Sequence, residues 1–176
     1  MDTSLVAGWE NFYVILGSSA GGLTGLTFVV IALIKERNPS VRPAGISVFM
    51  TPTIVHFGGV LAFAAFMTMP HPHVLTLSTI FVLAGAAGLV YSAVIGARMP
   101  GLGSVYVAVR EDWIWNVIVP GVIYAALLLE GLLIWRSHTE ALYGVAALSL
   151  ALLFVGIRNA WDIAVWTTLN VPKDPK

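Results

Sequence analysis

The amino-acid sequence predicts an all-α polytopic membrane protein, a bundle of five transmembrane helices with the N-terminus outside and the C-terminus in the cytoplasm. Three observations predict this fold class. Of the 176 residues, 58% are hydrophobic and 10% are charged, whereas soluble domains average roughly 25% charged residues. The mean hydropathy is +0.88. The few charges gather in short clusters between long apolar segments, as expected for a chain that crosses the bilayer several times.

Each apolar segment is long enough to cross the hydrocarbon core, for which a helix needs about 20 residues. No basic residue precedes the first segment, so it is expected to be a retained helix and not a cleaved signal peptide. The fifth segment is longer than the bilayer needs, and its last turns, from Arg158 onward, are expected at the cytoplasmic interface. The helices are expected over about residues 9–34, 44–69, 74–97, 113–135 and 141–169, in a single transmembrane domain spanning residues 1–176.

Orientation follows from the uneven distribution of Lys and Arg. Cytoplasmic loops collect positive charge, and Arg136 is the single basic residue on the side that holds the N-terminus. That side is therefore predicted to face outward, with the bilayer as the expected environment. The opposite side carries Lys35, Arg37, Arg42, Arg98, Arg110, Arg158, Lys173 and Lys176.

Composition also excludes several kinds of chemistry. The chain has no cysteine, which excludes disulfides, thiolate metal sites and thiol catalysis. No basic tract is long enough to indicate nucleic acid as a partner, and no cofactor is expected. Haem is disfavoured because His56 is the one histidine at membrane depth, and bis-histidine ligation would need another.

Small residues recur at four-residue steps on three of the expected helices. In lipid, such residues mark faces where two helix backbones approach closely. The pattern predicts tight packing but leaves open whether the neighbour belongs to the same chain, to a second copy in a homo-oligomer, or to a larger membrane-protein partner. The main positions are Gly17, Gly21 and Gly25 in the first helix, and Gly88 and Gly96 in the third.

Two expected helices contain an internal proline, Pro52 and Pro120. Each removes a backbone N–H and frees a carbonyl one turn earlier, so both are candidate hinges. The surrounding sequences are related, which suggests that helices two–three and four–five form a degenerate parallel repeat with the first helix as an extra element.

Three polar side chains from different helices, Ser19, His56 and Tyr124, are expected near the membrane midplane. A strongly polar group at that depth is a functional hypothesis by default. If the three faces converge, they form a site for a proton, an ion or a small molecule. The alternative is structural: His56 donates a hydrogen bond to the freed carbonyl of a kinked neighbouring helix and holds the bundle in register.

Ser19 also belongs to a G-x-S-x-G sequence, from Gly17 to Gly21. In hydrolases this motif needs a strand-to-helix turn, whereas here it lies within a helix and its glycines have a packing role. An intramembrane hydrolase with a Ser19–His56 dyad is therefore disfavoured, and no catalytic residue is assigned.

Two further groups lie near the ends of the spans. His71 and His73 follow Met67 and Met69 on the outer rim, a set of ligands that copper could use; the alternative is an ordinary rigid turn. Arg158 and Asp162 are four residues apart and can form an interfacial ion pair along one helix face. The simpler interpretation is that this pair anchors the helix at the membrane interface. The alternative hypothesis is that it is a docking or gating element.

Four stretches resemble small integral membrane proteins of bacteria, a family to which no activity is attached. They cover most of the chain, so the resemblance implies the bacterial plasma membrane and five helices but no functional residue. The leading expectation is an oligomeric channel or binding bundle for a small ion or solute. The alternative is a non-catalytic accessory or scaffold subunit of a larger membrane complex, and an intramembrane serine hydrolase comes third. The stretches are Phe12–Ala20, Thr51–Phe57, Glu111–Trp113 and Arg158–Asp162.

Overall fold

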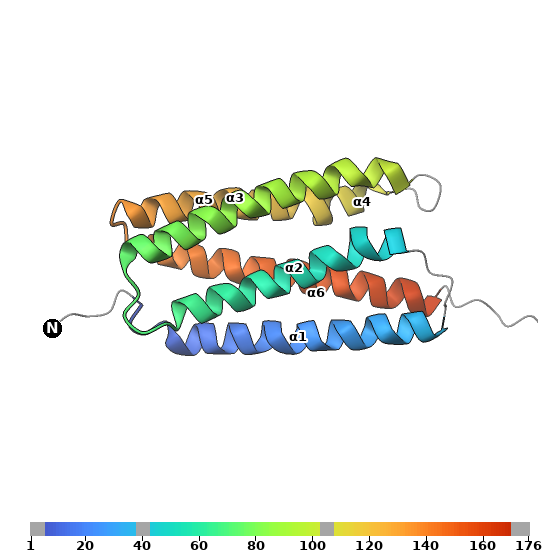
Figure 1. The fold of residues 1–176 in the computed structure, drawn as a ribbon, viewed down its shortest axis with the longest axis horizontal. Helices are drawn as coiled ribbons and strands as arrows, with labels where there is room; N and C mark the ends of the chain where they lie inside the picture. Colours follow the sequence, from blue (N-terminus) through green and yellow to red (C-terminus); the bar gives the residue numbers. More distant parts are fainter. Residues whose placement is uncertain (1–5, 38–42, 103–107, 170–176) are drawn as a thin grey trace, which may run out of the picture.

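A computed structural model describes residues 6–37, 43–102 and 108–169 of the chain. Five helices long and apolar enough to cross a membrane lie alongside one another in a single bundle (Figure 1). The all-helical, five-span prediction is confirmed, and each helix bound lies within three residues of its expected position. The elements are α1 (Glu10–Arg37), α2 (Pro43–Met67), α3 (Val74–Arg98), the short η1 turn (Met99–Leu102), α4 (Arg110–Trp113), η2 (Ile114–Ile118), α5 (Val119–Trp135) and α6 (Ala141–Leu169).

Successive spans run in opposite directions, so the bundle has two different ends (Figure 1). We call the end at which α1 finishes and α2 and α4 begin the basic end. The turn end is the opposite one, where short connections join α2 to α3 and α5 to α6. Among the described residues, Arg136 lies at the turn end, whereas the basic end has Lys35, Arg37, Arg98, Arg110 and, 11 residues before the end of α6, Arg158.

The most extensive contact between two helices is that of α3 with α5; α2 packs against both α1 and α6, and α6 also packs against α5. Glycine makes the α3–α5 approach close. A Cβ atom at Gly85 would lie 2.6 Å from the backbone nitrogen of Leu128, and one at Gly131 would lie 2.8 Å from that of Val82. The Ser78 hydroxyl also donates across this seam to the carbonyl of Gly131, at 2.8 Å.

The predicted packing glycines have unequal surroundings. In α3, a Cβ at Gly96 would lie 3.2 Å from Val117, and Gly88 faces α5. In α1, a Cβ at Gly17 would lie 2.8 Å from Cβ of Ala64, but one at Gly21 would meet only Leu61 at 4.0 Å. Gly25 has nothing within 4 Å of that position. Within one chain, therefore, Gly17 is the only one of these three α1 glycines that is tightly packed.

Candidate functional site

His56 of α2 and Tyr124 of α5 meet in the middle of the bundle. Nδ1 of His56 lies 3.0 Å from the hydroxyl oxygen of Tyr124, and the two side chains are only 1% and 4% exposed. Each residue lies 11 positions from the turn-end residue of its helix, Met67 or Trp135. At about 1.5 Å per residue this is about 17 Å, close to half of the roughly 30 Å hydrocarbon core.

Both members of this pair lie four residues after a proline. Pro52 is accommodated within the continuous helix α2. Before Pro120 the backbone changes, because the N–H of Val119 bonds the carbonyl of Ile114, five residues back, in a π turn. Such turns occur frequently at functional sites. α2 and α5 run in the same direction, and the residues four positions after the two prolines, His56 and Tyr124, lie against each other.

Ser19 does not join the pair. Its side chain is exposed, and its hydroxyl donates to the carbonyl of Ile15, one turn earlier in α1, at 2.8 Å. A helical serine commonly satisfies its hydroxyl in this way. The three-residue cluster expected from depth alone is therefore corrected to two residues, and the Ser19–His56 dyad is not formed.

Glycines of the neighbouring helices seat the aromatic rings around the pair. A Cβ atom at Gly88 of α3 would overlap the ring of Tyr124, and one at Gly156 of α6 would lie 2.5 Å from the ring of Phe57. Gly88 therefore packs against Tyr124, because its lack of a side chain makes room for the tyrosine ring. That ring is consequently held in one place opposite His56.

The second ring nitrogen of His56 gives the pair its chemistry. Nε2 is buried and has no hydrogen-bond partner among the described residues. If Nδ1 carries the proton it donates to Tyr124, and Nε2 is then an acceptor; in the other tautomer Tyr124 donates and Nε2 is a donor. In either state one nitrogen remains available to a small ligand.

Two asparagines that the sequence analysis did not single out form a second buried polar contact. Nδ2 of Asn159 in α6 donates to Oδ1 of Asn116 at 3.3 Å, and Nδ2 of Asn116 donates to the carbonyl of Asp112 at 3.1 Å. Both side chains are buried. A carboxamide inside an apolar span is costly unless it is hydrogen-bonded. The presence of two asparagines in apolar segments was the sequence signal from which this contact could have been suspected.

Arg158, the residue before Asn159 in α6, belongs to a cluster of charged and aromatic side chains, which we call the Arg158 cluster. Its guanidinium lies 2.7 Å from the carboxylate of Asp162 and 3.8 Å from that of Glu111. It also stacks on Trp115, 4.5 Å from the ring centre. The four-residue spacing of Arg158 and Asp162 thus corresponds to a close ion pair, extended by a carboxylate and an aromatic ring from the α4–η2 segment.

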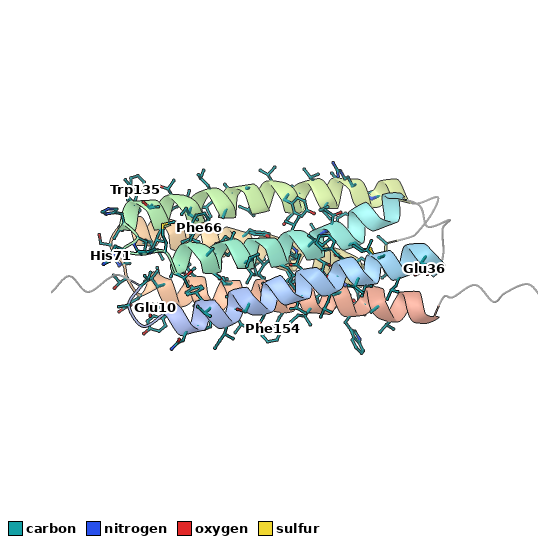
Figure 2. The ribbon with its side chains drawn as sticks, turned by 60° about the horizontal axis from the view of Figure 1, so that its bottom comes forward. Glu10, Glu36, Phe66, His71, Trp135 and Phe154 are labelled. Carbon is teal, nitrogen blue, oxygen red and sulfur yellow. The ribbon has the colours of Figure 1, made fainter. Side chains whose placement is uncertain are left out.

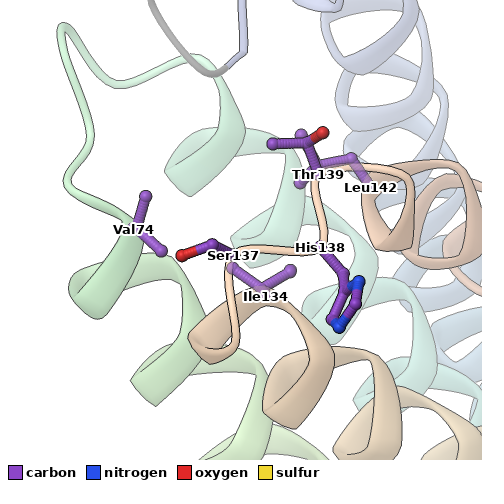
Figure 3. A pocket seen from close by; sticks show the side chains of 6 residues that line it. All are labelled: Val74, Ile134, Ser137, His138, Thr139 and Leu142. Carbon is purple, nitrogen blue, oxygen red and sulfur yellow. The ribbon is translucent and has the colours of Figure 1, made fainter.

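The turn end has exposed histidines and a small cavity. His71 and His73 are exposed, and Figure 2 shows His71 at that end of the bundle. Among the described residues, no group of three His, Cys, Asp or Glu side chains could hold a metal ion. A nearby cavity of about 40 Å³ has room for a few water molecules (Figure 3). Its lining residues are Val74, Ile134, Ser137, His138, Thr139 and Leu142.

No protein-family model, curated protein or solved structure matches this chain. The resemblance of the four sequence stretches therefore stays a prediction.

Proposed function

We propose that the chain is a multi-pass protein of the bacterial plasma membrane, with its N-terminus outside and its basic end in the cytoplasm. The distribution of Lys and Arg supports this orientation. A fluorescent protein fused after Lys176 is expected to fluoresce, since it folds on the cytoplasmic side, and alkaline phosphatase fused there is expected to be inactive. The reverse result would invert the topology.

Within that membrane the protein binds a small ion or solute at the His56–Tyr124 pair, and in a homo-oligomer it conducts this species. The observation that carries the proposal is the buried Nε2 of His56, which has no partner among the described residues at mid-span. An unsatisfied buried polar group costs about 1–3 kcal/mol, and a ligand that reaches it removes this cost. Because both residues belong to one chain, the site is complete in a single copy.

The test is flux of protons, Na⁺ and K⁺ into vesicles that contain the purified protein. His56→Ala is expected to abolish the flux, because it removes both ring nitrogens. Tyr124→Phe keeps the ring that packs on Gly88 and removes only the hydroxyl, so it is expected to weaken the flux without abolishing it. Retention of the wild-type helical content and elution volume is the control for folding.

If all three ions cross equally well with wild-type protein and with His56→Ala, the pair has no role in transport. A lower thermal unfolding temperature with unchanged flux would assign it the structural role, in which the hydrogen bond only fixes the register of α2 against α5.

A second candidate function is that of an accessory subunit in a larger membrane complex. The outer face of α1 favours it, because Ser18, Gly22 and Gly25 are exposed and the two glycines have no neighbour within 4 Å of a Cβ position. Native mass spectrometry of the protein, extracted gently at its native expression level, separates the two functions. A homo-oligomer supports the channel or binding function, whereas the added mass of a different polypeptide supports the subunit.

A further inference from the structure

Buried side-chain polar atoms that have no partner among the described residues lie mostly in one half of the bundle. Toward the turn end, the hydroxyl of Ser78 donates to Gly131 at 2.8 Å, and that of Ser149 donates to Val145 at 2.7 Å. From the midplane toward the basic end, four buried atoms have no partner among the described residues. A fifth such atom, the hydroxyl of Tyr13, lies near the start of α1 at the turn end. The four are Nε2 of His56, the hydroxyls of Tyr91 and Ser92, and Oδ1 of Asn159.

Helix register places these atoms at two neighbouring levels. Ser92 lies 18 residues after Val74, and Asn159 lies 18 residues after Ala141. At about 1.5 Å per residue both are about 27 Å from the turn end, some 10 Å beyond the level of His56.

The side chains of the two levels point toward each other, so the axial distance between their polar atoms is shorter than the distance between the backbone levels. Side chains tilt toward the N-terminus of their own helix. The helix of His56 begins at the basic end, so its ring tilts toward that end. The helices of Ser92 and Asn159 begin at the turn end, so their side chains tilt back toward the midplane. Beside Ser92, the missing side chain of Gly121 leaves further space, since a Cβ there would be 3.9 Å from Cβ of Ser92.

Buried polar groups in proteins nearly always have a partner, and ordered water is the usual one when no protein group is in reach. We propose that a file of ordered water molecules joins His56 to the basic end along Ser92, Tyr91 and Asn159. Water then supplies the hydrogen-bond partners that these atoms lack. The Asn116–Asn159 contact and the Arg158 cluster form the polar entrance of the path at the basic end.

The opposite half of the core closes the path. Between His56 and the turn end the buried side chains are mainly apolar, and the rings of Phe63 and Phe81 pack edge to face with centres 5.6 Å apart. The buried residues of this apolar half include Val60, Phe63, Phe81 and Leu127.

Access to the pair is thus one-sided. Protons and small hydrated species reach His56 from the basic end, and crossing the apolar half requires a rearrangement. This inference deepens the proposed function, because it names the side of entry and the class of species admitted at the same site.

The absence of cysteine from the chain makes the path directly measurable. Ser92→Cys places a thiol on the proposed path, and Ser149→Cys places one at a buried serine of the apolar half as the matched control. Both proteins are reconstituted in vesicles and exposed to Ag⁺ on one face at a time. Protection of the thiol is then read by maleimide labelling after denaturation.

Ag⁺ reacts with thiolates, and burial in apolar surroundings disfavours the thiolate, so Ser92→Cys is expected to react at least about tenfold faster than Ser149→Cys. It should do so only from the face that holds the basic end. Equal rates for the two cysteines, or equal rates from both faces, would overturn the proposal.

A second measurement uses the unsubstituted protein and does not depend on the folding of either variant. Radiolytic hydroxyl labelling marks side chains beside ordered water, and it is expected to modify Tyr91 while leaving Phe63 and Phe81 unmodified. The reverse pattern would contradict the path. Hydration without ion flux would retain the path and remove the proposed function, whereas flux without hydration would do the opposite.

Discussion

The glycines of the α3–α5 seam and those of α1 differ in what faces them. At Gly85 and Gly131 a backbone from the partner helix lies within 2.8 Å of a Cβ position, whereas nothing lies within 4 Å at Gly22 or Gly25. Both sets meet the condition for close helix approach in lipid. The difference shows that glycine in a membrane helix permits an approach without specifying which helix makes it, so the two regions respond differently to the same substitution.

The largest effect is expected for Gly85→Ala. The new methyl group meets the backbone of Leu128, which cannot yield as a side chain can, and overpacking of this kind typically costs about 1–3 kcal/mol of unfolding free energy. The measurement is the transition in mixed micelles of increasing denaturing-detergent fraction. A transition at the wild-type fraction would mean that α3 and α5 are further apart than the structure has them.

A smaller effect is expected for Ser78→Ala, which removes the hydrogen bond that crosses the seam to Gly131. Such bonds between membrane helices contribute about 0.6 kcal/mol on average. Ser149→Ala is the matched control, because that hydroxyl bonds within its own helix and its loss separates no pair of helices. The comparison breaks down if the two alanine variants shift the same unfolding transition equally.

The smallest effect is expected for Gly25→Ala. Its Cβ position is open, so the change in unfolding free energy should lie within about 0.5 kcal/mol, with a slight gain from the higher helix propensity of alanine. The informative readout is the mass of the native assembly. A shift from oligomer to single copies, with the unfolding transition unchanged, would locate a contact between copies on this face of α1.

The number of spans and their approximate bounds could be predicted because length and apolar composition are one-dimensional properties of the chain. The rotation of each helix about its axis could not. A helix that is apolar around its whole circumference lacks the polar stripe that would show which side faces inward. Ser19, His56 and Tyr124 therefore had the right depths for a cluster, but only two of them face each other.

The contact between the two asparagines could not be predicted from the sequence for the same reason. Asn116 and Asn159 are strongly polar residues within apolar spans and were visible in the sequence, yet their contact joins α6 to the π turn of η2. Proline at position 120 indicated a lost hydrogen bond but not that the helix would add a residue to that turn. These features depend on how neighbouring helices pack, which no single segment encodes.

Because α2 and α5 run in the same direction, α2–α3 and α5–α6 form two hairpins of the same orientation. Each of the pairs α2–α3 and α5–α6 leaves the basic end and returns to it, so a hairpin of this kind can be copied or inserted as a unit without reversing the copy. A chain made of the two hairpins alone would begin and end on the same face of the membrane. The additional span α1 places the start of α1 and the end of α6 at opposite ends of the bundle.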